Sequence, residues 1–140
     1  MNTKQIGHIA EIAFLLECAN RKITVSIPYG DNARYDFIVD INNKLLKVQV
    51  KHMKDKGKYY SFATRSTDWN SKIFKNYKDD VDYIFAYCKD DKNYVLVPVS
   101  KITQSSMTIR KHNAISTQIK KMNIIEDYQK WFDEYDAWQT

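Results

Sequence analysis

The pair Asn42-Asn43 constrains the fold of this chain more than any other feature, because it separates two stretches in which apolar and polar residues alternate. The stretches are residues 35–41 and 44–52. A period of two is typical of β-strands, and asparagine tolerates the positive φ angles that a two-residue hairpin loop requires. The sequence therefore predicts a tight hairpin, and counting outward from its loop places Asp36 opposite Gln49.

Three polar side chains converge in this hairpin. Gln49 and Lys51 lie two residues apart, so they point to the same face, and Lys51 is the diagonal neighbour of Asp36 on that face. The intervening apolar residues point to the other face and are expected to form a rigid floor. They are Phe37, Val39, Val48 and Val50.

Glu11 is a fourth candidate, from a helix that residues 3–20 predict by their apolar spacing. Its helical neighbours Phe14, Leu15 and Cys18 are all apolar, and a carboxylate in such a stripe is costly unless it is paired or binds a cation. If this helix packs on the sheet face that bears Asp36, Glu11 reaches the same cluster.

The four groups fit a hydrolytic metal site. The carboxylates of Asp36 and Glu11, the amide oxygen of Gln49 and the backbone carbonyl of Val50 are hard ligands that suit Mg²⁺, and Mn²⁺ is expected to substitute. Lys51 would orient an attacking water or stabilise negative charge on a phosphate. The structural alternative is an ordinary cross-strand ion pair between Asp36 and Lys51 on a solvated face.

The remaining pattern predicts a single domain over residues 1–140, with a core at about 1–100 and an extension at about 101–140 that contacts DNA or another subunit. A strand is expected at 23–27, a basic loop at 54–58 and a short strand at 59–63. A helix near 69–77, a hairpin of 81–88 with 94–99 and a terminal helix at 126–138 complete the pattern. The order α-β-β-β-α-β-β with a C-terminal helix indicates an α/β (α+β) fold around one central mixed sheet flanked by helices.

The charge distribution favours a nucleic-acid partner. The net charge is +5; residues 126–140 hold five acids against Lys130, a net of −4, so the other 125 residues carry +9. Candidate DNA contacts are Lys54, Lys56, Lys58, Arg65, Ser66, Arg110 and Lys111, against the alternative of a solubilising surface. No stretch is apolar enough to cross a membrane and no signal peptide is recognisable, so an intracellular protein is expected, cytoplasmic or organellar.

Four segments together resemble the PD-(D/E)XK nuclease superfamily. They are Gly7 to Glu11, Pro28-Tyr29-Gly30-Asp31-Asn32, Tyr35-Asp36 and Val48-Gln49-Val50-Lys51. The chain is most similar to the group I intron homing endonucleases of that superfamily, with Holliday junction resolvases as a related branch. The resemblance implies a restriction-endonuclease-like core, with Asp36 as the central metal ligand, Glu11 as a direct or water-mediated one and Lys51 as the motif lysine.

Gln49 departs from the usual pattern, because most of the superfamily has an acid there; the intron-encoded members are similar in carrying a glutamine. The resemblance implies a site-specific, Mg²⁺-dependent endonuclease of double-stranded DNA. A homo-oligomer, a dimer or tetramer, is expected from size, because so small a chain presents limited surface for reading DNA and cutting both strands together needs two active sites. One alternative is a Holliday junction resolvase. The other is a non-catalytic DNA-binding protein on a nuclease fold, which the missing acid at Gln49 motivates.

Overall fold

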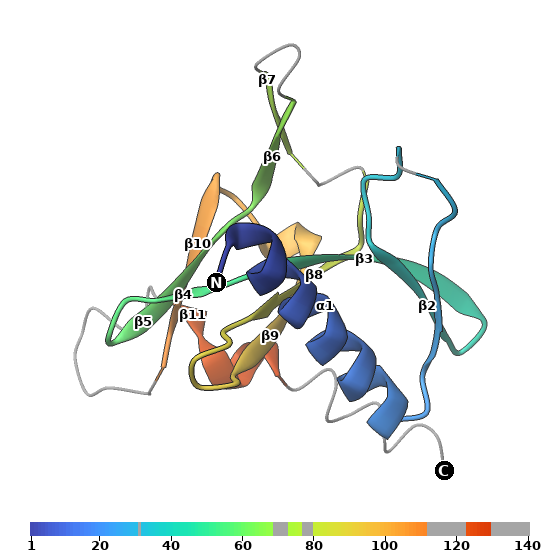
Figure 1. Cartoon of the computed structure of the whole chain (residues 1–140), viewed down its shortest axis with the longest axis horizontal. Helices are drawn as coiled ribbons and strands as arrows, with labels where there is room; N and C mark the ends of the chain where they lie inside the picture. Colours follow the sequence, from blue (N-terminus) through green and yellow to red (C-terminus); the bar gives the residue numbers. More distant parts are fainter. Residues whose placement is uncertain (31, 69–72, 77–79, 112–122, 130–140) are drawn as a thin grey trace.

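The computed structural model describes residues 1–30, 32–68, 73–76, 80–111 and 123–129. Its first element is the helix α1 (Thr3–Asn20), drawn in blue in Figure 1. The Asn2 side chain accepts a hydrogen bond from the backbone N–H of Gln5, and the Gln5 side chain accepts one from the N–H of Asn2. This capping box satisfies two amide groups that would otherwise lack partners, which explains why the helix begins where the sequence predicts.

A five-stranded mixed sheet forms the centre of the molecule. Its strands are β1 (Thr24–Ser26), β2 (Phe37–Ile41), β3 (Lys44–His52), β8 (Tyr83–Tyr87) and β9 (Tyr94–Pro98), and they lie in that order across the sheet. The pair β3 and β8 is parallel, and the other neighbouring pairs are antiparallel. The predicted mixed sheet and both predicted hairpins are therefore confirmed.

The hairpin of β2 and β3 has the predicted register. Ile41 pairs with Lys44 and Phe37 with Val48. The two loop residues have positive φ angles, 52° at Asn42 and 63° at Asn43, as the type I′ turn that suits twisted strands requires. A shift of one residue would turn every side chain of β3 to the wrong face, so this turn decides where Gln49 and Lys51 point.

We expect Asn43→Gly to stabilise the protein by about 0.5 kcal/mol, because glycine adopts the positive φ of the second loop position without steric cost. Asn43→Ala is the matched control and should destabilise the protein by about 1 kcal/mol, since alanine disfavours that conformation. Urea unfolding measures both changes. Equal stability of the two variants would argue against a type I′ turn.

Helix α1 covers one face of the central sheet (Figure 1). Phe14 stacks on Phe37 at a centroid distance of 5.4 Å and meets Phe85 edge to face at 5.0 Å. Such pairs add about 0.5–1.5 kcal/mol each to the stabilisation from burying the rings. The same core contains further buried residues of the helix and the sheet, namely Ala10, Cys18, Val39, Ile41, Val48, Val50 and Leu96.

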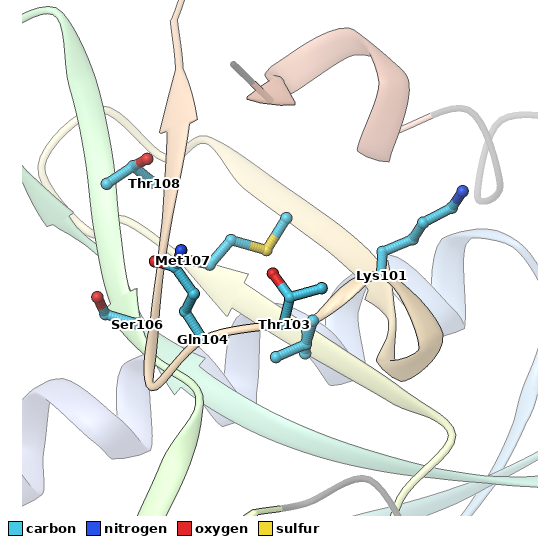
Figure 2. Close-up of a pocket in the computed structure, with 7 residues that line it drawn as sticks. Lys101, Thr103, Gln104, Ser106, Met107 and Thr108 are labelled. Carbon is cyan, nitrogen blue, oxygen red and sulfur yellow. The ribbon is translucent and has the colours of Figure 1, made fainter. Parts of the chain in front are cut away.

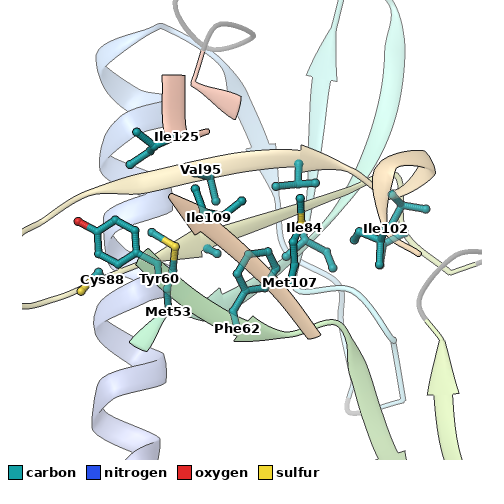
Figure 3. Close-up of a cluster of buried hydrophobic side chains, with 14 residues drawn as sticks. Met53, Tyr60, Phe62, Ile84, Cys88, Val95, Ile102, Met107, Ile109 and Ile125 are labelled. Carbon is teal, nitrogen blue, oxygen red and sulfur yellow. The ribbon is translucent and has the colours of Figure 1, made fainter. Parts of the chain in front are cut away.

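A second sheet covers the opposite face. Its strands, in spatial order, are β11 (Asn123–Ile124), β10 (Ser106–Arg110), β5 (Tyr59–Ala63) and β4 (Lys54–Asp55). Its apolar side chains meet Ile84 and Val95 of the central sheet in a second core, shown in Figure 3. The predicted fold class is confirmed; among the described residues it is strands and not a helix that pack on this face, and the predicted basic loop at 54–58 contains strand β4. Alternation in β10 buries Met107 and Ile109, so part of the chain after residue 100 belongs to this core.

The predicted helix at 69–77 is wrong where the structure describes it. Strand β7 (Ile73–Asn76) pairs with β6 (Arg65–Asp68) in an antiparallel ladder, and Figure 1 shows the two projecting from the body. The periodicity of so short an apolar segment does not distinguish a helix from a strand.

Within the part of the chain that the structure describes, two short 3₁₀ turns, η1 (Val99–Lys101) and η3 (Ile125–Tyr128), complete the elements. The predicted terminal helix lies outside the described residues from position 130 onward. Among the residues that are described, no helix combines the length and apolar character needed to cross a membrane.

Candidate active site

Asp36 lies at the point where β2 begins. Its backbone N–H donates to the carbonyl of Val48 at 2.9 Å, and its Oδ2 accepts a hydrogen bond from the N–H of Val50 at 2.8 Å. If the pairing of β2 with β3 continued, a backbone carbonyl would accept the hydrogen bond from Val50. Here the Asp36 carboxylate accepts it instead. This contact fixes the acid beside β3, and the other carboxylate oxygen can bind a cation.

Gln49 and Lys51 flank Val50 and point away from α1. Side chains alternate along β3, and Val48 and Val50 belong to the core beneath the helix. The predicted apolar floor of the hairpin is confirmed, but the helix that packs on it is α1 itself. Glu11 therefore lies on the helix that covers the floor, whereas Gln49 and Lys51 point to the other face of the sheet.

Glu11 still interacts with Asp36. It lies on the flank of α1 beside the buried Ala10, with 41% of its side chain exposed and Nδ1 of His8 3.9 Å from its Oε2. Partial burial and the negative charge of Asp36 both raise the pKa of Glu11, and His8 opposes them. Asp36 lies at the start of a strand, and its carboxylate interacts electrostatically with both Glu11 on α1 and Lys51 on β3.

The pKa of Asp36 is raised as well. Burial is the largest cause, and the hydrogen bond from Val50 and the positive charge of Lys51 act against it. Two neighbouring carboxyls with raised pKa values indicate that the fold holds negative charge here at a cost. A divalent cation between them would offset this cost.

We expect Asp36→Asn to be more stable than the wild type at pH 7 when divalent cations are absent. The folded pKa lies above the ordinary value of 3.8. Below pH 3.8 the carboxyl is protonated in both the folded and the unfolded protein. As the pH rises from there through the folded pKa, ionisation favours the unfolded state, so the wild type loses stability that Asp36→Asn retains. Urea unfolding with EDTA should show the advantage of the variant at about pH 7 and not at about pH 3. An equal difference at both pH values would contradict the raised pKa.

The donor atoms fit a hard cation. In a strand the N–H and C=O of one residue point to the same side, so the carbonyl of Val50 faces the side on which Asp36 accepts its N–H. The amide of Gln49 is the next side chain along β3. No group of three or more His, Cys, Asp or Glu side chains gathers within the described parts of the chain, so this set offers two carboxylates and neutral oxygens.

Two contacts that the sequence does not reveal hold the segment leading to Asp36. Arg34 forms an ion pair with Asp80 at 3.2 Å, and the ammonium of Lys47 lies 5.6 Å from the ring centroid of Tyr35. Tyr35 also packs against the second core. Asp80 is distant from Arg34 in the sequence, and Lys47 reaches Tyr35 from the neighbouring strand β3.

The candidate DNA contacts do not form one group. Lys54, Lys56 and Lys58 are exposed along the β4–β5 hairpin, and Arg65 is exposed at the start of β6, whereas Arg110 is partly buried. The side chain of Ser66 lies outside what the structure describes. Lys111 differs from the others, because its ammonium contacts Asp55 at 2.6 Å and lies 4.8 Å from the ring centroid of Tyr60. The Lys111 side chain therefore takes part in an internal ion pair.

Two hollows lie apart from the Asp36 cluster. One, of about 330 Å³, is formed by residues 101–104 with Ser106, Met107 and Thr108 (Figure 2). Its lining contains no acid, so it offers no charged ligand for a cation. The other, of about 480 Å³, includes Asp91 and Asn93, and both side chains already bind the hydroxyl of Tyr60.

Comparisons with known proteins also indicate a nuclease. A family model described as PD-(D/E)XK endonuclease matches residues 1–131. The chain is similar to a solved bacterial homing endonuclease, I-Ssp6803I, with a TM-score of 0.77, 24% identity, and coverage of 100% of this chain and 99% of that one. At this identity the likeness shows the fold, which is restriction-endonuclease-like.

A second solved structure, MepB, gives a TM-score of 0.40 at 13% identity, covering 96% of this chain and 95% of that one, which is too distant to argue from. No curated protein sequence matches the chain.

Proposed function

The chain belongs to the PD-(D/E)XK endonuclease family, and from this premise we propose that it is a site-specific endonuclease that hydrolyses phosphodiester bonds in double-stranded DNA with Mg²⁺. The observation that carries the proposal is the carboxylate of Asp36, held by the N–H of Val50 in electrostatic contact with both Glu11 and Lys51. A purely structural ion pair has no need of a second acid.

The residues of the cluster would divide two tasks, binding of the cation and stabilisation of charge at the phosphate. Asp36, Glu11, the amide oxygen of Gln49 and the carbonyl of Val50 would hold Mg²⁺, which when bound supplies a Lewis acid for the phosphate and lowers the pKa of a coordinated water. Lys51 places a positive charge beside Asp36, where it can orient the attacking water or stabilise charge that develops on the phosphate. The hydrogen bond from Val50 holds the Asp36 carboxylate in position, so little reorganisation is needed during the reaction.

DNA binding is assigned to basic side chains outside the cluster, chiefly Lys54, Lys56, Lys58 and Arg65, which are exposed. They would contact phosphates, and binding should weaken as salt rises. A chain of this size presents limited surface for reading DNA, and cutting both strands together needs two active sites. A homo-oligomer is therefore part of the proposal.

We expect Gln49→Glu to bind Mg²⁺ on the order of tenfold more tightly, because the added charge supplies the acid that most of the superfamily has at this position. The midpoint of a thermal-shift titration with MgCl₂ measures the change. Asp40→Asn, an exposed substitution on β2, is the control and should leave the midpoint unchanged. An unaltered midpoint for Gln49→Glu would remove Gln49 from the metal site.

One experiment separates the proposed activity from its two rivals. The protein is incubated with MgCl₂ or EDTA and three substrates: plasmid DNA carrying candidate intron-insertion sequences, random linear duplex and a synthetic four-way junction. Cutting at one plasmid position, only with MgCl₂, supports the proposal. Preference for the junction supports a resolvase, and binding without Mg²⁺-dependent cleavage of any substrate supports a non-catalytic DNA-binding protein.

A further inference from the structure

Lys47 lies on the same face of β3 as Gln49 and Lys51. Side chains two residues apart in a strand point the same way at a separation of about 7 Å, so Gln49 has one lysine on each side of it along the strand. Lys47 is exposed, whereas Gln49 and Lys51 are partly buried. The row of polar groups at the candidate metal site is therefore continued by a second, exposed cation.

The backbone of Lys47 is held from the β8 side of β3. Its N–H donates to Oδ2 of Asp82 at 2.9 Å, and its carbonyl accepts a hydrogen bond from the N–H of Asp82, also at 2.9 Å. The carbonyl of Asp82 in turn accepts a hydrogen bond from the N–H of Val99 at 3.0 Å. These bonds tie Lys47 to the start of β8, so movement at this position is confined to its side chain.

The ammonium group of Lys47 is held by an aromatic ring and not by an acid. It lies 5.6 Å from the ring centroid of Tyr35, within the range of a cation–π interaction. None of the ion pairs found among the described residues involves Lys47. The ring face attracts the charge and leaves the three N–H donors of the ammonium available to an oxyanion. Tyr35 directly precedes Asp36, so this charge lies beside the segment that carries the proposed central ligand.

We propose that Lys47 binds the DNA phosphate next to the one that is cut, and so positions the strand at the cation. This inference rests on the proposed function, in which the cation beside Asp36 and Gln49 holds the phosphate that is cut. A DNA strand carries one phosphate per nucleotide, so further phosphates follow on both sides of the bound one. Lys51 lies on one side of Gln49, where its charge acts on the Asp36 carboxylate. Lys47 lies on the other side, where it meets the neighbouring phosphate.

The alternative is that Lys47 only supports Tyr35, and Lys47→Met separates the two roles. Methionine keeps an unbranched apolar stem beside the ring and removes the charge. The midpoint of a thermal-shift titration with MgCl₂ should therefore stay within about twofold of the wild type, while the cleavage rate at saturating DNA falls about tenfold. Lys47→Arg restores the charge and should cut within about threefold of the wild-type rate. A weakened Mg²⁺ midpoint in Lys47→Met, with no rescue of cleavage by Lys47→Arg, would indicate the structural role and overturn the proposal.

The salt dependence of DNA affinity tests the phosphate contact without any cleavage, because it is measured in EDTA. Loss of one contact should reduce the slope of log affinity against log salt concentration by about 0.9. Lys44→Met is the matched control, since Lys44 is an exposed lysine of the same strand whose side chain points to the opposite face. The control should keep the wild-type slope. An unchanged slope for Lys47→Met, or an equal fall in both variants, overturns the proposal.

The position of the contact is tested with duplexes in which one phosphate is replaced by an uncharged methylphosphonate. For the wild type, replacement of one phosphate adjacent to the cut position should lower the cleavage rate about tenfold. Lys47→Met has already lost this contact, so the same replacement should not slow it further. Equal losses in the two proteins at both adjacent phosphates would overturn the proposal. If the wild type cuts no substrate, the proposed function fails separately, and the salt slope in EDTA decides whether Lys47 binds a phosphate.

Discussion

Asp36→Asn should abolish DNA cleavage, with a fall in rate on the order of a thousandfold or more, while the protein remains folded. The substitution keeps an oxygen that can accept the hydrogen bond from the N–H of Val50, so the local structure is preserved. It removes the negative charge that would bind the cation together with Glu11, and a neutral amide holds Mg²⁺ far less tightly. A thousandfold loss corresponds to about 4 kcal/mol of transition-state stabilisation.

The measurement is single-turnover cleavage of the mapped substrate at saturating protein, together with a thermal shift on adding MgCl₂. The wild type should gain stability from the ion and the variant should not, because only binding to the folded state stabilises it. Asp40→Asn is the matched control on the same strand and should cut at the wild-type rate. Retention of cleavage by Asp36→Asn to within tenfold would exclude Asp36 as the central ligand.

Lys51→Ala should reduce cleavage by about a hundredfold to a thousandfold and leave DNA affinity within about threefold of the wild type. The positive charge of Lys51 opposes the rise in the pKa of Asp36 that burial causes. Lys51 therefore lies at the cluster and apart from the exposed basic residues. One lost charge among many phosphate contacts weakens binding slightly, whereas its loss at the reacting phosphate affects the transition state directly.

Lys44→Ala is the control for Lys51, because Lys44 is an exposed lysine at the start of the same strand. Cleavage rate and filter-binding affinity are measured in parallel at one salt concentration. If both variants lose cleavage and binding in the same proportion, Lys51 serves only as a phosphate contact and has no part in catalysis.

The hairpin of β2 and β3 shows what local sequence determines. Two asparagines fix the loop conformation, the loop fixes the register, and alternation assigns each side chain to a face. These steps depend only on neighbouring residues, so the sequence predicts correctly that Asp36 lies beside β3 and that Gln49 and Lys51 share a face. The capped start of α1 is local in the same sense.

The packing of distant elements could not be predicted in this way. The apolar stripe of α1 shows that the helix packs somewhere but not on which face of the sheet, and the choice depends on Phe37 and Phe85 together. The second sheet joins β5 to β10, which lie far apart in the sequence, through backbone contacts that a short apolar run does not specify. The hydrogen bond from Val50 to Asp36 depends in turn on where β2 leaves β3, which alternation alone does not give.

The central claim is that Asp36 anchors one divalent cation beside β3, and anomalous diffraction from a crystal grown with MnCl₂ tests it most directly. We expect one strong peak at coordination distance, about 2.2 Å, from a carboxylate oxygen of Asp36, with the carbonyl of Val50 or the amide oxygen of Gln49 also in reach. The peak should be absent from crystals of Asp36→Asn. A Mn²⁺ peak that makes no contact with Asp36, or one that persists unchanged in the variant, would contradict the account.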